Sequence, residues 1–462
     1  MTHALEWPSL TCQWLPNIRE TTGSSTREHS LLLGTHTTGE PNHLLVCTVH
    51  LPANNDTPIV VDSNSNNNSN SNNSNNNSAI HTLPASHYDE EKCEVGGFGF
   101  QHLGSSAATT TTTTTSNPQL DGVVEVKMKI LHEGEVHRAR YCPQDPFVIA
   151  TKGPSNYVYI FDLSKHPSFP AAGPDESNTP KPNLVLGGHT KDGYGLSWSN
   201  HTKGHLISGS LDCTVCYWDI HHKPTSSTTS SSLIMDPICT FTGHTGPVED
   251  VDWHKLDPHL IGSCGDDATV RLWDVRAAGG ASSTASTTTT KEAHLISKAH
   301  DGDVHCLAFH PTNEFLLATG SADRSVVLWD MRNTKTRLQT LTGHNDQVFQ
   351  VSWAPFNESI LASCSADRRV NIWDLSRIGM EQTPEDAEDG PPELLFIHGG
   401  HTSKVNDFSW NGINPWTIAS VSEDNVLQVW TMAEEIYADD EEESEDGDDD
   451  KEEEILREDE IE

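Results

Sequence analysis

Residues 343–374 read GHNDQVFQVSWAPFNESILASCSADRRVNIWD, beginning with Gly-His and ending with Trp-Asp. Large apolar and polar residues alternate over residues 349–353, which is typical of a strand with one buried face. Residues 360–365 and 370–374 have the composition of two further short strands, and the polar turn at residues 367–369 separates them. The stretch therefore predicts three consecutive short strands.

The same markers return at a fixed spacing, which identifies an internal repeat. In six units an aromatic residue lies 29 residues after a histidine, and these histidines are His132, His189, His244, His300, His344 and His401. In five of the units an Asp lies 23 residues after the histidine: Asp212, Asp267, Asp323, Asp367 and Asp424. Three strands and a variable fourth are typical of a propeller blade, and the Gly-His and Trp-Asp markers resemble the signature of WD repeats.

The repeats predict an all-β fold, a seven-bladed WD-repeat β-propeller. Six units account for residues 132–431, and residues 10–15, 29–35 and 44–51 look like the strands of one more blade. Because a propeller must join its ends to hide its sheet edges, we expect the strand at residues 11–15 to complete the blade that holds residues 401–431. The repeated His, Asp and Trp N–H groups are expected to hydrogen-bond in series, which locks each blade and leaves no catalytic or metal site among them.

The propeller is expected to span residues 1–433. Segments rich in Asn, Ser or Thr interrupt it near residues 54–78, 105–116, 225–232 and 277–290. We expect these insertions to be disordered loops, because they bury too little apolar surface to offset the entropy of the chain. Residues 434–462 hold 19 acidic residues against Lys451 and Arg457, and predict an acidic disordered tail.

Charge and motif content exclude several classes of function. The chain has 28 Lys and Arg against 67 Asp and Glu, a formal net charge of −39, so we expect no direct DNA binding. No apolar run is long enough to span a membrane, and the first residues lack the pattern of a secretory signal, so we expect a soluble intracellular protein. The sequence contains no P-loop, GxSxG or HExxH motif, and we predict no enzyme, cofactor or metal site.

Irregular segments outside the repeats carry a more specific resemblance. These segments are MTHALEWPSLT at residues 1–11 with QWLP at 13–16, EDAEDGPPELLFIHGGH at 385–401 and QVWTMAEEIY at 428–437. They closely resemble the retinoblastoma-associated, MSI-like family of histone-binding WD-repeat proteins, over residues 1 to about 437 without the insertions. The resemblance implies a noncatalytic nuclear subunit that binds arginine-rich core histones. It also implies membership of multiprotein complexes for chromatin assembly, histone deacetylation, remodelling or Polycomb methylation.

The acidic loop at residues 381–393 leads into the apolar residues 394–397 and predicts a groove for a basic amphipathic helix. A solvated loop is the alternative. By resemblance, Asp386 and Asp389 pair with histone arginines, and Phe396, Ile397 and Ile436 form an apolar floor. The full set of expected groove residues is Glu385, Asp386, Asp389, Gly390, Pro391, Pro392, Phe396, Ile397 and Ile436. Family members carry a long amphipathic helix before the segment matched by residues 1–11. This sequence begins at that segment, so we expect either a shortened gene model or half a groove with weakened helix binding.

A second site is expected where the loops before the inner strands converge on the central channel. Positions three and five after the repeat histidines carry Glu135, Asp192, Tyr194, Glu249, Asp303 and Asn406, with Lys404 as a basic exception. A ring of carboxylates at a narrow opening would attract an Arg- and Lys-rich peptide, whereas an evenly acidic surface is the alternative. By resemblance, Glu6, His36 and Glu423 join this ring, while His137 and His305 replace Asn and Gln347 replaces an acidic residue.

Two further features leave the functional interpretation open. Residues 273–276 and 329–332 fit the Trp-Asp-x-Arg pattern associated with cullin adaptor docking, which makes a substrate receptor of a cullin-type ubiquitin ligase the alternative function. The acidic tail either keeps the protein soluble or holds basic histones loosely. The protein alone is expected to be a monomer.

Overall fold

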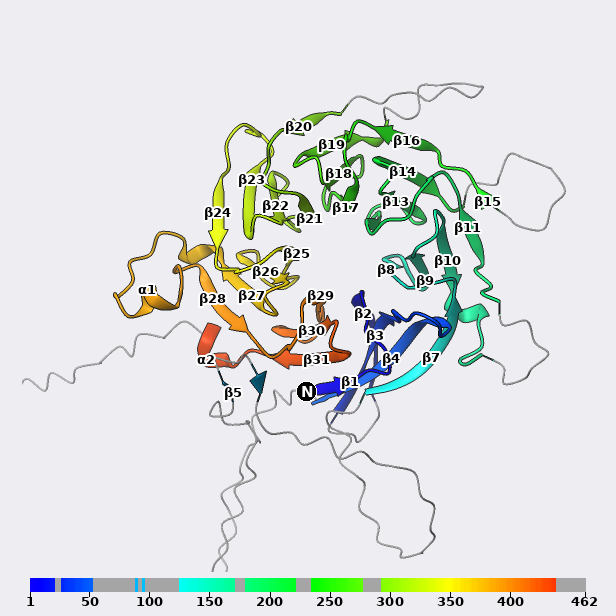
Figure 1. Ribbon diagram of the computed structural model, residues 1–462, viewed down its shortest axis with the longest axis horizontal. Helices are drawn as coiled ribbons and strands as arrows, with labels where there is room; N and C mark the ends of the chain where they lie inside the picture. Colours follow the sequence, from blue (N-terminus) through cyan, green and yellow to red (C-terminus); the bar gives the residue numbers. More distant parts are fainter. Residues whose placement is uncertain are drawn as a thin grey trace, which may run out of the picture.

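The computed structural model describes residues 1–20, 26–52, 88–89, 94–95, 124–170, 179–221, 234–276 and 292–437. Seven sheets are arranged as blades around a central axis, which confirms the predicted all-β propeller (Figure 1). The four predicted insertions and residues 438–462 of the predicted tail lie outside the described residues. The first four residues assigned to the tail form the short helix α2 (Glu434–Tyr437).

Each blade is a sheet whose first strand lies nearest the axis. Blade 1 contains β2 (Cys12–Glu20), β3 (Thr26–Gly34), β4 (Asn42–Pro52) and β7 (Val124–His132). Blade 2 contains β8 (Arg138–Cys142), β9 (Asp145–Lys152), β10 (Val158–Asp162), β11 (Leu184–Leu186) and the added β15 (Ile234–Met235). Blade 3 contains β12 (Leu196–Trp198), β13 (His205–Gly209), β14 (Thr214–Asp219) and β16 (Cys239–Thr242). A separate two-stranded sheet joins β5 (Tyr88–Asp89) to β6 (Glu94–Val95).

Blades 4 to 7 follow the same plan. Blade 4 contains β17 (Val248–Trp253), β18 (Leu260–Gly265), β19 (Val270–Asp274) and β20 (His294–Ile296), and blade 5 contains β21 (Val304–Phe309), β22 (Leu316–Ser321), β23 (Ser325–Asp330) and β24 (Gln339–Thr342). Blade 6 contains β25 (Val348–Trp353), β26 (Ile360–Ser365), β27 (Val370–Asp374) and β28 (Leu394–His398). Blade 7 contains β29 (Val405–Trp410), β30 (Thr417–Ser422), β31 (Val426–Thr431) and β1 (Thr2–Ala4). Helix α1 (Asp386–Asp389) lies between β27 and β28, and short 3-10 turns cover Leu163–Lys165 and Leu375–Arg377.

The ring closes through β1, and the expectation that residues 11–15 close it was wrong. Strand β1 pairs antiparallel with β31 of blade 7, whereas residues 12–15 belong to β2, the inner strand of blade 1. Residues 1–5 can cover the edge of β31 because the Met1 ammonium donates to the Val429 carbonyl at 2.7 Å and the Leu5 N–H donates to the Asn425 carbonyl at 2.7 Å. The chain therefore uses the segment before β2 to hide the last sheet edge.

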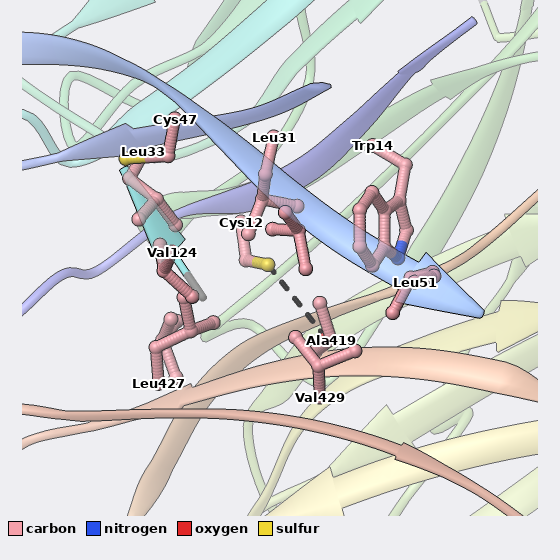
Figure 2. Close-up of a cluster of buried hydrophobic side chains, with 12 residues drawn as sticks. Cys12, Trp14, Leu31, Leu33, Cys47, Leu51, Val124, Ala419, Leu427 and Val429 are labelled. Atoms are coloured by element: carbon pink, nitrogen blue, oxygen red, sulfur yellow. Dashed lines mark hydrogen bonds between the residues drawn. The ribbon is translucent and has the colours of Figure 1, made fainter. Parts of the chain in front are cut away.

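Apolar side chains pack between neighbouring blades. At the closure, Cys12 and Trp14 of β2 and Leu31 of β3 contact Ala419 of β30 and Val429 of β31 in one buried cluster (Figure 2). The alternation of each strand places its apolar residues in these layers between sheets. Since each cluster joins two blades, the core is continuous around the ring.

The predicted hydrogen-bonded series is complete in blades 4, 5 and 6, and it runs through a hydroxyl group that the sequence prediction did not include. In blade 4, His244 Nδ1 pairs with Asp267 at 3.0 Å, while His244 Nε2 and Trp273 Nε1 both bond to Ser263 Oγ at 2.8 Å. A Ser or Thr stands 19 residues after the histidine in all six units: Thr151, Ser208, Ser263, Thr319, Ser363 and Ser420. That fixed position was the signal that could have identified it.

Candidate functional site

The loops before the inner strands surround a cavity of about 360 Å³ at one end of the central channel. Six of the nine residues predicted for this channel mouth line the cavity: His36, Glu135, Tyr194, Glu249, Lys404 and Glu423. Asn406 lines it too. Glu6, Asp192 and Asp303 do not line it. The structure therefore brings most of the predicted mouth together.

Most carboxylates at the mouth are already paired. Glu135 contacts His36 Nε2 at 3.1 Å, and Glu423 contacts Lys404 Nζ at 2.8 Å. Glu6 is paired with Lys129 at 3.4 Å, away from the cavity lining. The mouth is therefore a mixture of acidic and basic groups, less negative than a bare ring of carboxylates.

Glu249 differs from the other acidic residues of the mouth. Burial raises the pKa of Glu249 to about 7, and the nearby carboxylates of Asp266, Asp250 and Asp303 act in the same direction. Among the described residues it forms no ion pair. A cationic side chain entering the cavity would therefore find in Glu249 a carboxyl group that gains from an opposite charge.

Aromatic rings form two walls of the mouth. Tyr194 stacks on His137 with ring centroids 4.7 Å apart, and Phe349 stacks on His305 at 5.5 Å. Arg138 lies at the floor, where it donates to Gln350 Oε1 at 3.4 Å. His137, His305 and Phe349 all stand five residues after a repeat histidine, so applying that spacing to every unit would have placed them in the site.

Arg138 also lines a second cavity of about 320 Å³ at the inner strands, so its side chain separates two spaces along the channel. Asp250, which lines this second cavity, is buried. Burial raises the pKa of Asp250 to about 6 although Arg138 opposes that change. The channel floor is thus a buried set of opposite charges beneath the mouth.

The residues predicted for the helix groove comprise the acidic helix α1 and the apolar residues of β28 and α2. Helix α1 and its preceding residue carry Glu385, Asp386 and Asp389, which are all exposed and form no ion pair within the described part of the chain. Thr383 Oγ1 donates to Asp386 at 2.8 Å and accepts the Asp386 N–H, which fixes the start of the helix. Gly390 ends the helix with a φ of 141°, a value that favours glycine.

The apolar floor is assembled from two elements, and one predicted residue faces elsewhere. Phe396 of β28 packs against Trp430 with ring centroids 5.8 Å apart, and Ile436 of α2 joins the same cluster. Ile397 lies on the other face of β28, opposite Asn371, because side chains alternate along a strand. The structure therefore brings Phe396 and Ile436 together and leaves Ile397 apart from them.

Pro391 and Pro392 are half-buried between α1 and β28. The Pro391 carbonyl accepts the N–H of Leu394 at 2.9 Å, so the two prolines form a tight connection into the strand. They connect the acidic helix to the strand that carries Phe396.

Sequence reasoning missed several apolar residues near this groove. Ile378 and Met380 precede α1 and are 37% and 58% exposed, which is unusual for large apolar side chains in a loop that also carries charge. Tyr437 of α2 stacks on Trp416 with ring centroids 4.3 Å apart. The aromatic content of residues 416–437 was the available signal, but the contact depends on how α2 folds back.

The repeat histidines of the described blades are buried and engaged in the hydrogen bonds of their own blades. Within the described ranges, no group of His, Cys, Asp and Glu side chains could hold a metal ion. None of the helices in the described segments is long and apolar enough to cross a membrane.

Comparison with known protein families gives two matches. The family of the histone-binding protein RBBP4, whose description also names the CAF1 complex, matches residues 1–53, which include strands β1 to β4. The family described as WD domain, G-beta repeat matches residues 180–219, 235–274, 292–330, 335–374 and 392–431. Each of these five segments ends on the second residue of a Trp-Asp pair or, at residue 431, of its Trp-Thr variant.

Proposed function

Since the chain belongs to the RbAp-type family of histone-binding WD-repeat proteins, we propose that it is a noncatalytic nuclear subunit that presents arginine-rich core histones to chromatin complexes. The complexes would be those of chromatin assembly, histone deacetylation, remodelling or Polycomb-type methylation. A rigid propeller with several separate binding surfaces suits such a scaffold, because a histone and a second protein can bind at the same time.

The observation that carries the proposal is that the acidic helix α1, which forms no ion pair among the described residues, precedes β28, whose Phe396 packs in one cluster with Ile436. An amphipathic helix with arginines on one side could place its charges against Asp386 and Asp389 and its apolar stripe against the cluster. The channel mouth offers a second, smaller site, in which a cationic side chain would lie between the aromatic walls and next to Glu249.

A binding measurement with two histone peptides tests both sites. One peptide is a basic amphipathic histone helix and the other is an arginine-rich histone tail, and both are followed by fluorescence polarisation at moderate salt. The double variant Asp386→Lys/Asp389→Lys should weaken the helix peptide at least tenfold and leave the tail peptide unchanged. Glu249→Gln should weaken binding of the tail peptide and leave binding of the helix peptide unchanged.

The control reverses two exposed charges that line neither site, Asp257→Lys/Glu314→Lys, because it changes the net charge by the same amount. If the control weakens both peptides as much as the site variants do, binding is a general effect of an acidic protein. Failure of the parent protein to bind either peptide would contradict the proposal.

The second candidate function is a substrate receptor of a cullin-type ubiquitin ligase. Its support is the position of Arg332, whose guanidinium is held by Asp330 at 2.8 Å and lies 4.5 Å from the Phe315 ring, close to exposed apolar surface. Arg276 is held in the same way by Asp274. Charge reversal at both arginines should abolish adaptor binding without affecting the histone peptides, and unchanged adaptor binding would remove this candidate.

A further inference from the structure

A third cavity, of about 410 Å³, lies over the turn between β26 and β27 and over the connection from blade 6 to blade 7. Its wall contains Asn345, Arg368, Arg369 and His401. It adjoins the channel mouth along the chain, because Asp346 lines this cavity and the next residue, Gln347, lines the mouth. A peptide that binds at the mouth can therefore reach this cavity with its flanking residues.

Two half-buried arginines in this cavity have no acidic partner among the described residues. This is unusual in a chain with a net charge of −39, in which most other described arginines are paired: Arg140, Arg271, Arg276, Arg332, Arg337 and Arg377. Side chains of Arg368 and Arg369 that are partly removed from water and unpaired have lost hydration without gaining an ion pair. An anion in the cavity would compensate the two arginines for the lost hydration.

The backbone fixes where Arg368 points. Arg368 has a φ of 70° at the turn after Asp367, a conformation repeated at the matching turn residue of other blades: Cys213, Ala268, Arg324 and Asn425. The turn geometry is thus imposed by the repeat, and the side chain at this position projects from a rigid base. Arg324 occupies the same turn one blade earlier and does not line the cavity, which makes it a matched control.

His401, which lines the same cavity, also has a polar atom without a hydrogen-bond partner. In blades 4, 5 and 6 the Nδ1 atom of the repeat histidine pairs with the repeat Asp at 2.9 to 3.1 Å. In blade 7 the repeat Asp424 instead accepts the N–H and the hydroxyl of Thr402, at 2.9 and 2.7 Å. His401 Nδ1 is left buried without a hydrogen-bond partner.

We assign the unpaired Nδ1 of His401 as a donor. Trp430 Nε1 donates to Ser420 Oγ at 3.3 Å, so the hydroxyl proton of Ser420 is free for His401 Nε2, 2.7 Å away. Nε2 then accepts, and by this assignment the ring proton lies on Nδ1. An oxyanion held by the arginines supplies, through a bridging water, the acceptor that this donor lacks.

Two carboxylates in the wall decide which anion fits. Asp367 is occupied, since it accepts from His344 Nδ1 and from the N–H groups of Asn345 and Arg369. Asp346 is exposed and lies at the side of the cavity next to the mouth. A single carboxylate would gain little against Asp346, whereas a phosphoryl group brings nearly two charges and three acceptor oxygens to the two guanidinium groups.

We propose that Arg368, Arg369 and Asn345 form a binding site for a phosphoserine or phosphothreonine on a basic peptide that is anchored at the channel mouth. The proposal rests on the proposed function, because the mouth supplies the anchor. A cationic residue of the peptide lies at the mouth, and the phosphoryl group follows at the distance between the two cavities. Phosphorylation of the partner would then strengthen its binding to this face of the propeller.

The test compares arginine-rich, fluorescein-labelled peptides that carry either serine or phosphoserine at successive positions after one arginine. At one position phosphorylation should tighten binding to the parent protein about tenfold, as expected for charge-assisted, bidentate hydrogen bonds. The gain should shrink as salt is added. Arg368→Gln/Arg369→Gln should abolish the gain and leave the serine peptide unchanged, whereas Arg324→Gln should retain it. Equal binding of all serine and phosphoserine pairs, or a gain that persists in the double variant, overturns the proposal.

A second measurement separates failure of the site from failure of the mouth. Inorganic phosphate is added to the full chain at constant ionic strength, and the thermal midpoint is measured, because a ligand of the native state stabilises it. The midpoint should rise for the parent and for Arg324→Gln and stay constant for Arg368→Gln/Arg369→Gln. If no peptide binds, a rise of the thermal midpoint with phosphate still supports the anion site. If neither the gain on phosphorylation nor the rise of the midpoint is observed, the proposal is refuted.

Discussion

The guanidinium of Arg140 in β8 donates to the carboxylate of Asp407 in β29 at 3.1 Å, although the two strands belong to blades 2 and 7. The same carboxylate accepts the N–H of Cys12 at the start of β2, at 2.9 Å. One buried side chain thus connects the last blade to the first and the second. The propeller is therefore closed near its axis by an ion pair as well as at its outer edge by β1.

Removing Asp407 should strongly destabilise the ring. The side chain of Asp407 is only 1% exposed, so Asp407→Ala leaves the Arg140 charge and the Cys12 N–H buried without their acceptor. We expect a loss of about 3–5 kcal/mol in the free energy of unfolding, measured by denaturant titration. Asp274→Ala, which removes the exposed partner of Arg276, is the control and should change stability little. Equal effects of the two variants would show that the Arg140–Asp407 pair does not contribute to closure.

The sequence predicted the parts of the fold that repeat and missed those that occur once. The 29-residue spacing was enough to locate six blades, because each is specified by local strands and turns. Strand β1 has only three residues, too few for alternation to be visible, so its role in closure could not be inferred. The pairing of His36 with Glu135 and of Glu6 with Lys129 joins segments far apart in the chain, and no sequence pattern predicts such contacts.

Lys152 should make stability depend on pH at the alkaline end. This side chain is fully buried, and its ammonium group in blade 2 donates to Ser208 Oγ at 2.6 Å and to the Gly209 carbonyl in blade 3. Burial lowers the pKa of Lys152 to about 8, below its ordinary value of 10.5. Between these values the unfolded chain binds more protons than the native protein, so the free energy of unfolding rises as the pH rises through this window. This added stability is lost as the pH falls through 8.

The measurement compares the parent with Lys152→Met by denaturant titration from pH 7 to 10.5. Groups that titrate in both proteins cancel, so the parent should gain about 3 kcal/mol relative to the variant over this range. Lys127→Met, which removes a lysine at the surface of blade 1, is the control for the loss of one positive charge. Parallel curves for the parent and Lys152→Met would contradict the assigned pKa.

The closing strand can be tested with two proline substitutions that differ by one residue. Hydrogen-bonded pairs alternate along an antiparallel ladder, and Met1 with Val429 and Leu5 with Asn425 are bonded, so the N–H of His3 faces Leu427 while that of Ala4 points away. His3→Pro removes a ladder hydrogen bond and should lower the thermal midpoint, whereas Ala4→Pro should lower it less. A midpoint of His3→Pro equal to that of the parent would indicate that β1 contributes little to closure.

Binding of a basic peptide at the channel mouth should tighten as the pH rises through 7. Glu249, whose pKa burial raises to about 7, attracts a cationic side chain only when ionised. His36, His137 and His305 line the same cavity, and burial lowers the pKa of His137. We expect affinity to rise about threefold to tenfold between pH 6 and pH 8, measured by fluorescence polarisation at constant ionic strength. Glu249→Gln should flatten this profile, while Glu358→Gln, an exposed change outside the cavities, should reproduce the parent profile. A profile of Glu249→Gln that overlays the parent would mean that the peptide does not approach Glu249, and would place its cationic residue elsewhere on the face.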